Sequence, residues 1–150
     1  SVGGIVSDFR KIVVGVDGSP ASMKAVLWAA HEATLRNSEI EILHSWSMPF
    51  VADPLAMMPM MFPVEEMVAE AGKIVAAAAA IVSGADPKIH VNTRVERGAA
   101  SEYLIAAGKS ADLLVVGSRG HGGFAGLLLG SVAQQVANHA TCPVVIVPAK

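Results

Sequence analysis

The chain has little cysteine, little charge and few aromatic residues. Its single cysteine, Cys142, excludes an intramolecular disulfide framework and favours a reducing, cytoplasmic compartment. Charged residues make up 16% of the 150 residues and aromatic residues 5%, whereas 53% are hydrophobic. The formal net charge of −2 gives no basic footprint for DNA or RNA, so we expect no nucleic-acid partner. One apolar domain, such as a parallel sheet covered on both faces, fits this size and composition.

Acidic residues are missing from the whole C-terminal part. No Asp or Glu follows Asp112, whereas Arg119, His121, His139 and Lys150 are all present there. A surface without carboxylates does not repel a polyanion. This part of the chain is therefore the first candidate for an anion site.

Long uninterrupted hydrophobic runs are also missing. The apolar stretch 74–82 is too short to span a membrane. The uncharged stretch 122–149 is interrupted by Gln134, Gln135 and Pro143, which favours a buried helix followed by a buried strand. We expect no membrane partner.

Strand patterns alternate with helix patterns along the chain. Short apolar or alternating runs predict strands at 11–16, 39–45, 89–95, 112–117 and 143–147. Apolar residues at helical spacing predict helices at 20–36, 64–82, 101–109 and 131–140. This order predicts an α/β fold with an open five-stranded parallel sheet and helices on both faces. The strand at 89–95 is expected to be less buried than the others.

Helix boundaries carry their usual residues. Ser19 followed by Pro20 predicts a hydroxyl cap with proline at the first helical position, and Asn37 predicts the end of the same helix. Ser101 and Ser131 are predicted to cap two later helices.

The domain organisation is simple. We interpret residues 1–8 as a flexible N-terminus that includes a cloning remnant at its start, and residues 9–150 as one domain. Residues 47–63 contain four prolines and five methionines, which predicts a long loop. Its thioethers suit Cu(I), but an adaptable apolar flap over a cleft or against a partner is the preferred interpretation.

Asp17, Ser45, Gly98 and Gly117 each follow a predicted strand. In open parallel sheets, ligands bind beyond the carboxyl ends of the strands, where the strand order switches direction. These residues are therefore predicted to share one rim of the sheet.

A glycine-rich segment joins the fourth strand to the last helix. Gly117 and Gly120 are followed after nine residues by Gly130 and Ser131. Glycines leave backbone N–H groups uncovered, and a helix start adds the positive end of its dipole, so the segment favours phosphate. A glycine loop that only turns the chain is the structural alternative.

Two common nucleotide motifs are excluded. A Walker A loop needs a lysine before its Ser or Thr, and residues 129–131 contain none. The stretch 120–125 matches a loose dinucleotide fingerprint, but the acidic residue expected about twenty positions later is absent.

The chain resembles the universal stress protein family over nearly its whole length, from Phe9 to Pro148. The spacing of Gly117, Gly120, Gly130 and Ser131 is that of the family's ATP-binding members. The opening segment 14–19 and the closing segment 142–147 are also similar to the family. The resemblance implies a Rossmann-like fold of the adenine nucleotide alpha hydrolase type, strand order 3-2-1-4-5, adenine-nucleotide binding and a homodimer.

The resemblance also implies residue roles. Gly117, Gly120, Gly130, Ser131 and Val132 would contact the phosphates and ribose.

Two further residues would complete the site by the same resemblance. Asp17 would lie at the ribose and phosphate end and help hold Mg²⁺, and Ser45 would offer backbone groups to the adenine edge. Asp17 also suits a role in capping the turn at Ser19 and Pro20, and both roles are compatible. Arg119 and His121 lie inside the loop, where either could contact phosphate, and solvation of Arg119 is an equal alternative.

The last strand and the remaining polar residues complete the sequence-based picture. The last strand, if it lies at a sheet edge, would need cover over Val144, Val145, Ile146 and Val147. Pairing with a second copy would supply it, and cover by the chain termini of a monomer is the alternative. His44 and His90 are expected to be structural, and Cys142 a small buried hydrophobe. No two histidines have metal-ligand spacing.

Three function classes follow. The preferred one is an ATP-binding stress-response protein that acts by nucleotide-dependent conformation or association and is not an enzyme; a cyclic-nucleotide binder is a variant of it. A slow ATPase or other ATP-using enzyme is the first alternative, although no base, loop lysine or nucleophile pair is identifiable. A nucleotide-free interaction module is the second.

Overall fold

The computed structural model describes residues 9–48, 63–120 and 129–149. The expected flexible N-terminus, most of the methionine-rich loop, and His121 lie outside these ranges. Within them, strands and helices alternate as the sequence predicts.

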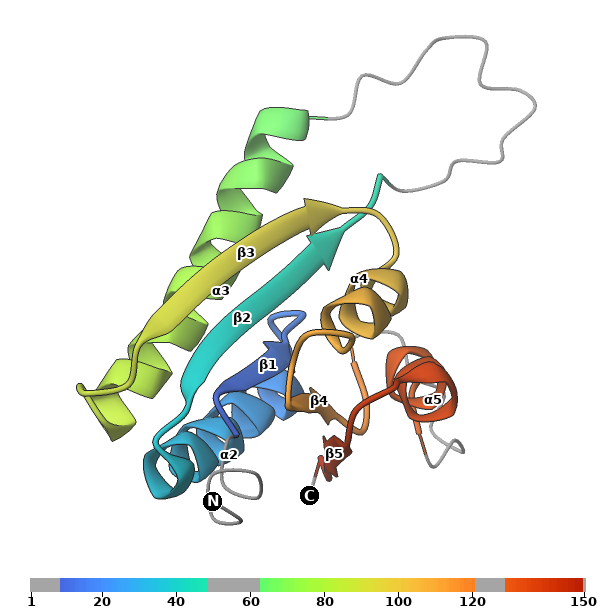
Figure 1. Cartoon of the computed structure of the whole chain (residues 1–150). Coiled ribbons are helices and arrows are strands. Elements are labelled where there is room, and N and C mark those ends of the chain that lie inside the picture. The colour runs from blue at the N-terminus through green and yellow to red at the C-terminus, as the bar shows by residue number, and fades with distance from the viewer. Residues whose placement is uncertain (1–8, 49–62, 121–128, 150) are drawn as a thin grey trace, which may run out of the picture.

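Five parallel strands form one sheet in the order β3-β2-β1-β4-β5, which confirms the predicted fold class and strand order (Figure 1). The strands are β1 (Lys11–Gly15), β2 (Glu39–Trp46), β3 (Val91–Arg97), β4 (Leu113–Gly117) and β5 (Val144–Val147). The central strands β1 and β4 are the most buried because both their faces are covered. The edge strand β3 is half-buried or exposed along its length, as predicted.

Helices cover both faces of the sheet (Figure 1). They are α2 (Pro20–Arg36), α3 (Val64–Ala85), α4 (Ala100–Ala107) and α5 (Ser131–His139). One core lies between the sheet and the pair α2 and α3, and includes Ile12, Val14, Ile40 and Val75. The other lies under α4 and α5, and includes Val13, Leu43, Leu104 and Val136. Alternate residues of β1, β2 and β4 therefore supply opposite cores.

The boundaries of α2 confirm the predicted capping residues. Ser19 has extended backbone and its side chain accepts a hydrogen bond from Ser22 N, with Pro20 at the first helical position. Asn37 ends the helix in the left-handed conformation, which Asn adopts more readily than most residues.

Two predicted caps are wrong. The cap position of α4 is Ala99, and that of α5 is Gly130; neither helix start has a side-chain cap. Ser101 and Ser131 already lie inside their helices. Gly98, with φ of +137°, turns the chain directly after β3, and the cap position of α4 lies two residues before Ser101.

Several element boundaries also differ from the prediction, most clearly those of β3 and α3. β3 begins two residues later and ends two residues later than expected, because its register is set by pairing Val91 with Ile40 and Arg97 with Trp46 of β2. α3 continues to Ala85 rather than ending near Val82.

The length of α3 changes one sequence-based argument. Its 22 residues are long and apolar enough, by length and composition, to cross a membrane, although the apolar stretch 74–82 within it is too short by itself. Val75, Ala78 and Val82 pack in the core with α2 and the sheet. That packing is the arrangement of a helix layered on a sheet, and the absence of a membrane partner stays a prediction.

Candidate functional site

A cavity of about 300 Å³ lies at the carboxyl ends of β1 and β4. These two strands are neighbours, and the chain proceeds from β1 toward β3 on one side and from β4 toward β5 on the other. The cavity therefore lies at the topological switch point of the sheet, where ligands of open α/β folds bind. Its volume is at the lower end of the range for small-molecule sites.

The cavity has an apolar inner wall and a polar rim. The inner wall comes from β1, β2 and β4 and from the helices α4 and α5: Gly15, Leu43, Ala100, Leu104, Val116 and Ala133. The rim comes from the turns after β1 and β4 and from the start of α5: Asp17, Ser118, Arg119, Gly120, Gly130 and Ser131. A flat apolar group at the inner wall and an anion at the rim would each meet suitable chemistry.

The structure brings together all but one of the predicted site residues. The lining includes Asp17, Gly117, Arg119, Gly120, Gly130, Ser131 and Val132. Val132 is 38% exposed, so its first-turn position is open to solvent as well as to the cavity.

Ser45 is the exception, because it is not among the lining residues. Its hydroxyl donates to the carbonyl of Gly98 and so ties the end of β2 to the turn before α4. Leu43, two residues earlier on the same face of β2, lines the cavity instead. A contact between the backbone of Ser45 and a base stays a prediction.

At each of the three motif glycines, a Cβ would lie closer to a neighbouring atom than ordinary van der Waals contact. A Cβ on Gly120 would lie 2.4 Å from Asp17 Oδ2, and one on Gly117 would lie 3.2 Å from the backbone of Ala21. A Cβ on Gly130 would lie 3.3 Å from Arg119 Cα. The glycines therefore let two backbone segments and the Asp17 carboxylate converge on one rim.

The start of α5 carries neither a side-chain cap nor an acidic residue in its first turn. Gly130 N donates to Ser118 O at 2.6 Å, which holds the two ends of the glycine segment together. The first N–H groups of a helix have no acceptor within the helix, and the helix dipole places positive charge there. This rim position can accept an anion.

Asp17 has the turn-capping role that the sequence suggested. Its Oδ1 accepts from Ser19 N at 2.9 Å, and its own N–H donates to Ser22 Oγ at 3.3 Å. Asp17 also lines the cavity, and its Oδ2 lies beside Gly120. One residue thus fixes the β1–α2 turn and presents negative charge to the cavity.

Sequence reasoning missed the apolar wall. Leu43 could have been found from strand alternation, since it shares a face with Ser45. Ala100 and Leu104 could not, because α4 reaches the cavity only through its packing across the sheet. Leu104 packs so closely that a Cβ on Gly15 would lie 2.9 Å from it.

The remaining candidate residues lie elsewhere. His44 is buried and its Nδ1 lies 2.7 Å from Val16 O, as expected for a structural histidine. His90 is exposed just before β3. Cys142 is half-buried rather than buried, and burial raises the pKa of its thiol. In the described part of the chain, no group of three metal-ligating side chains comes together.

Comparison with known proteins agrees with this geometry. The model of the universal stress protein family matches residues 8–148. A universal stress protein of Mycolicibacterium smegmatis is 40% identical over 91% of this chain and 45% of its own length. The chain spans about half the length of the curated relatives it matches.

Solved structures show the same fold. UspA of Lactobacillus plantarum superposes with a TM-score of 0.76 at 22% identity, over 93% of this chain and 97% of that one. A universal stress protein in complex with cAMP superposes with a TM-score of 0.71 at 29% identity, over 95% of this chain and 98% of that one. With the switch-point cavity, the glycine spacing and the family match in agreement, the chain belongs to the universal stress protein family.

Proposed function

We propose that this protein binds an adenine nucleotide, most importantly ATP, in the switch-point cavity, and responds to stress through nucleotide-dependent conformation or association. The observation that carries the proposal is the convergence of the glycine segment and the uncapped start of α5 on one rim of the cavity. Backbone N–H groups at a helix start bind phosphate. The related structure in complex with cAMP supports an adenine nucleotide as the ligand class.

Charge at the rim gives Asp17 a second proposed role. Arg119 and Asp17 both line the cavity, so its described charged residues are of opposite sign. A polyphosphate beside a carboxylate is unfavourable unless a divalent cation or a ribose hydroxyl lies between them. Asp17 would therefore hold Mg²⁺ with the nucleotide or accept from the ribose.

The output would be association rather than catalysis. Among the described lining residues, Asp17 is the only carboxylate, and none is a histidine, lysine or cysteine that could serve as a base or nucleophile. β5 lies at the sheet edge, and its four residues are half-buried. Pairing of Val144–Val147 with a second copy would complete their burial and place the nucleotide site near the dimer interface.

The proposal is tested by calorimetry with ATP, AMP and cyclic AMP, each with and without Mg²⁺. Gly120→Ala is expected to weaken binding on the order of a hundredfold, because the new Cβ meets Asp17. Gly72→Ala is the matched control, since a Cβ there meets nothing within 4 Å. Wild-type protein that binds none of the three would favour a nucleotide-free interaction module. Magnesium-dependent phosphate release at ordinary turnover rates, lost in Asp17→Asn, would favour an ATP-using enzyme.

A further inference from the structure

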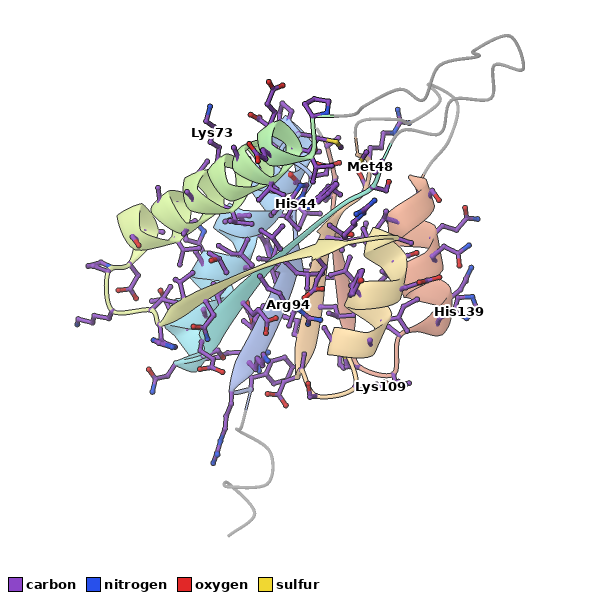
Figure 2. The ribbon with its side chains drawn as sticks, turned by 90° about the horizontal axis from the view of Figure 1, so that it is seen from above. His44, Met48, Lys73, Arg94, Lys109 and His139 are labelled. Atoms are coloured by element: carbon purple, nitrogen blue, oxygen red, sulfur yellow. The ribbon has the colours of Figure 1, made fainter. Side chains whose placement is uncertain are left out.

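His44 is a buried polar residue on the opposite side of β2 from the cavity wall. By strand alternation it lies on the same face as Ile40 and Ile42, which belong to the core under α2 and α3. Figure 2 labels His44 near β2. Only 7% of its surface is exposed, so its hydrogen bonds decide whether it is tolerated there. Its Nδ1 lies 2.7 Å from Val16 O. Because a carbonyl oxygen only accepts, Nδ1 must carry the hydrogen.

This hydrogen bond lies where β1 and β2 separate. Val16 N still donates to Leu43 O at 2.9 Å, as in the parallel ladder. The carbonyl of the same residue meets the imidazole of His44. The side chain thereby bridges the two strands at the last point before the chain turns toward the cavity rim.

The peptide between Val16 and Asp17 is consequently held at both ends. Its carbonyl accepts from His44, and its N–H, which belongs to Asp17, donates to Ser22 Oγ at 3.3 Å. A peptide unit is planar, so fixing both groups fixes the direction in which the chain enters Asp17. The carboxylate then reaches Ser19 N with Oδ1 and lies beside Gly120 with Oδ2.

We propose that His44 is a positioning residue for the nucleotide site: through the Val16 carbonyl, it sets the orientation of the Val16–Asp17 peptide and hence the place of the Asp17 carboxylate on the cavity rim. The inference rests on the proposed nucleotide site. Without the imidazole, the Val16 carbonyl loses its side-chain donor, and rotation of the peptide would move the Asp17 carboxylate away from Gly120. A histidine that only filled the core would act on stability alone.

Two substitutions separate positioning from filling. His44→Asn keeps a nitrogen donor at the place of Nδ1 with less volume, and His44→Leu keeps volume without a donor. We expect His44→Leu to weaken AMP binding about tenfold and His44→Asn to retain affinity within about threefold, both by calorimetry. His31→Leu, at an exposed position of α2, is the control and should bind AMP as wild type. Equal weakening in both His44 variants, or no weakening in His44→Leu, would overturn the inference.

A double-mutant cycle tests whether His44 acts through Asp17. In an Asp17→Ala background, His44→Leu should cause no further loss of AMP affinity, because the carboxylate that it orients is gone. The same loss in both backgrounds would show that His44 acts independently of Asp17.

Nitrogen NMR of the wild-type protein is the test that depends on no variant folding. His44 should show a protonated Nδ1; an unprotonated Nδ1 would overturn the inference. Wild-type protein that fails to bind any adenine nucleotide would instead overturn the proposed function, and this outcome is distinct from all those above.

Discussion

Two of the helices that begin at the cavity, α2 and α5, differ in how their first turns are satisfied. α2 follows β1, and its start is closed by its own side chains: Ser19 Oγ accepts from Ser22 N at 3.2 Å, and Asp17 Oδ1 accepts from Ser19 N. α5 follows β4, the neighbouring strand, and starts at Gly130 with no side-chain cap and no acidic residue. Of these two helix starts on one rim, that of α2 is thus capped by side-chain oxygens and that of α5 is not.

The difference shows how a helix start becomes a ligand site. Every helix start presents N–H groups without acceptors in the helix, and a side-chain oxygen normally satisfies part of them. Of the four helices described, α3 and α4 have acidic residues in their first turns and α2 has the Ser19 cap, whereas α5 has neither. The start of α5 is therefore the one most suited to an external anion.

The largest effect on the difference between α2 and α5 is expected when the start of α5 is given its own carboxylate. Val132→Glu places a carboxylate in the first turn of α5. There it competes with phosphate and is stabilised by the positive end of the helix dipole. We expect AMP affinity to fall on the order of a hundredfold while the melting temperature is unchanged or higher. Val68→Glu, at a 50% exposed position of α3, is the matched control and should leave affinity unchanged. Unaltered AMP binding in Val132→Glu would contradict an anion site at this helix start.

Removing the charge at the start of α2 should have a smaller effect. Asp17→Asn keeps an oxygen acceptor for Ser19 N but removes the carboxylate from the cavity. We expect the dependence of ATP affinity on Mg²⁺ to disappear, with a loss of about tenfold at saturating Mg²⁺. Calorimetry across a Mg²⁺ series measures this, and a preserved Mg²⁺ dependence would place the cation elsewhere.

Removing the side-chain cap of α2 should lower the stability of the protein rather than its affinity for nucleotide. Ser19→Ala removes the oxygen that accepts from Ser22 N, and we expect the free energy of unfolding to fall by about 1 kcal/mol. Ser101→Ala should leave it unchanged, because the structure gives α4 no side-chain cap. Urea titration compares the two variants. Equal losses would mean that Ser101 stabilises the start of α4 after all.

The smallest effect is expected at helix ends far from the rim. Thr34 Oγ1 donates to Asp86 at 2.7 Å, and this hydrogen bond is the main reason that the pKa of Asp86 is lowered. A lowered pKa in the folded state gives stability that is present above the ordinary Asp value of 3.8 and is lost as the pH falls through the folded pKa. Thr34→Val should lower the melting temperature by about one degree at pH 7.

The pH series supplies the control for this last variant. The difference in melting temperature between Thr34→Val and wild type should vanish in strong acid, where Asp86 is protonated in both the folded and the unfolded state. AMP affinity at pH 7 should be the same in both proteins. A difference in melting temperature that persists in acid would mean that the effect comes from the packing of the Thr34 hydroxyl and not from the charge of Asp86.

Much of the fold was predictable because local signals agreed with it. Ser19, Pro20 and Asn37 marked the bounds of α2 correctly, since capping depends on neighbouring backbone groups. Ser101 and Ser131 failed as caps because the turn at Gly98 and the contacts of Gly130 decide where those helices begin. The bounds of β3 failed for a similar reason, because pairing with β2 sets them.

By itself, the sequence determined the order of strands and helices, the glycine spacing and the absence of acids beside it, because each is a property of neighbouring residues. Only the tertiary structure decided that Leu43 rather than Ser45 lines the cavity, that Leu104 of α4 forms its wall, and that His44 meets the Val16 carbonyl. These contacts join segments far apart in the chain. Their geometry follows from strand register and helix packing, which no local pattern encodes.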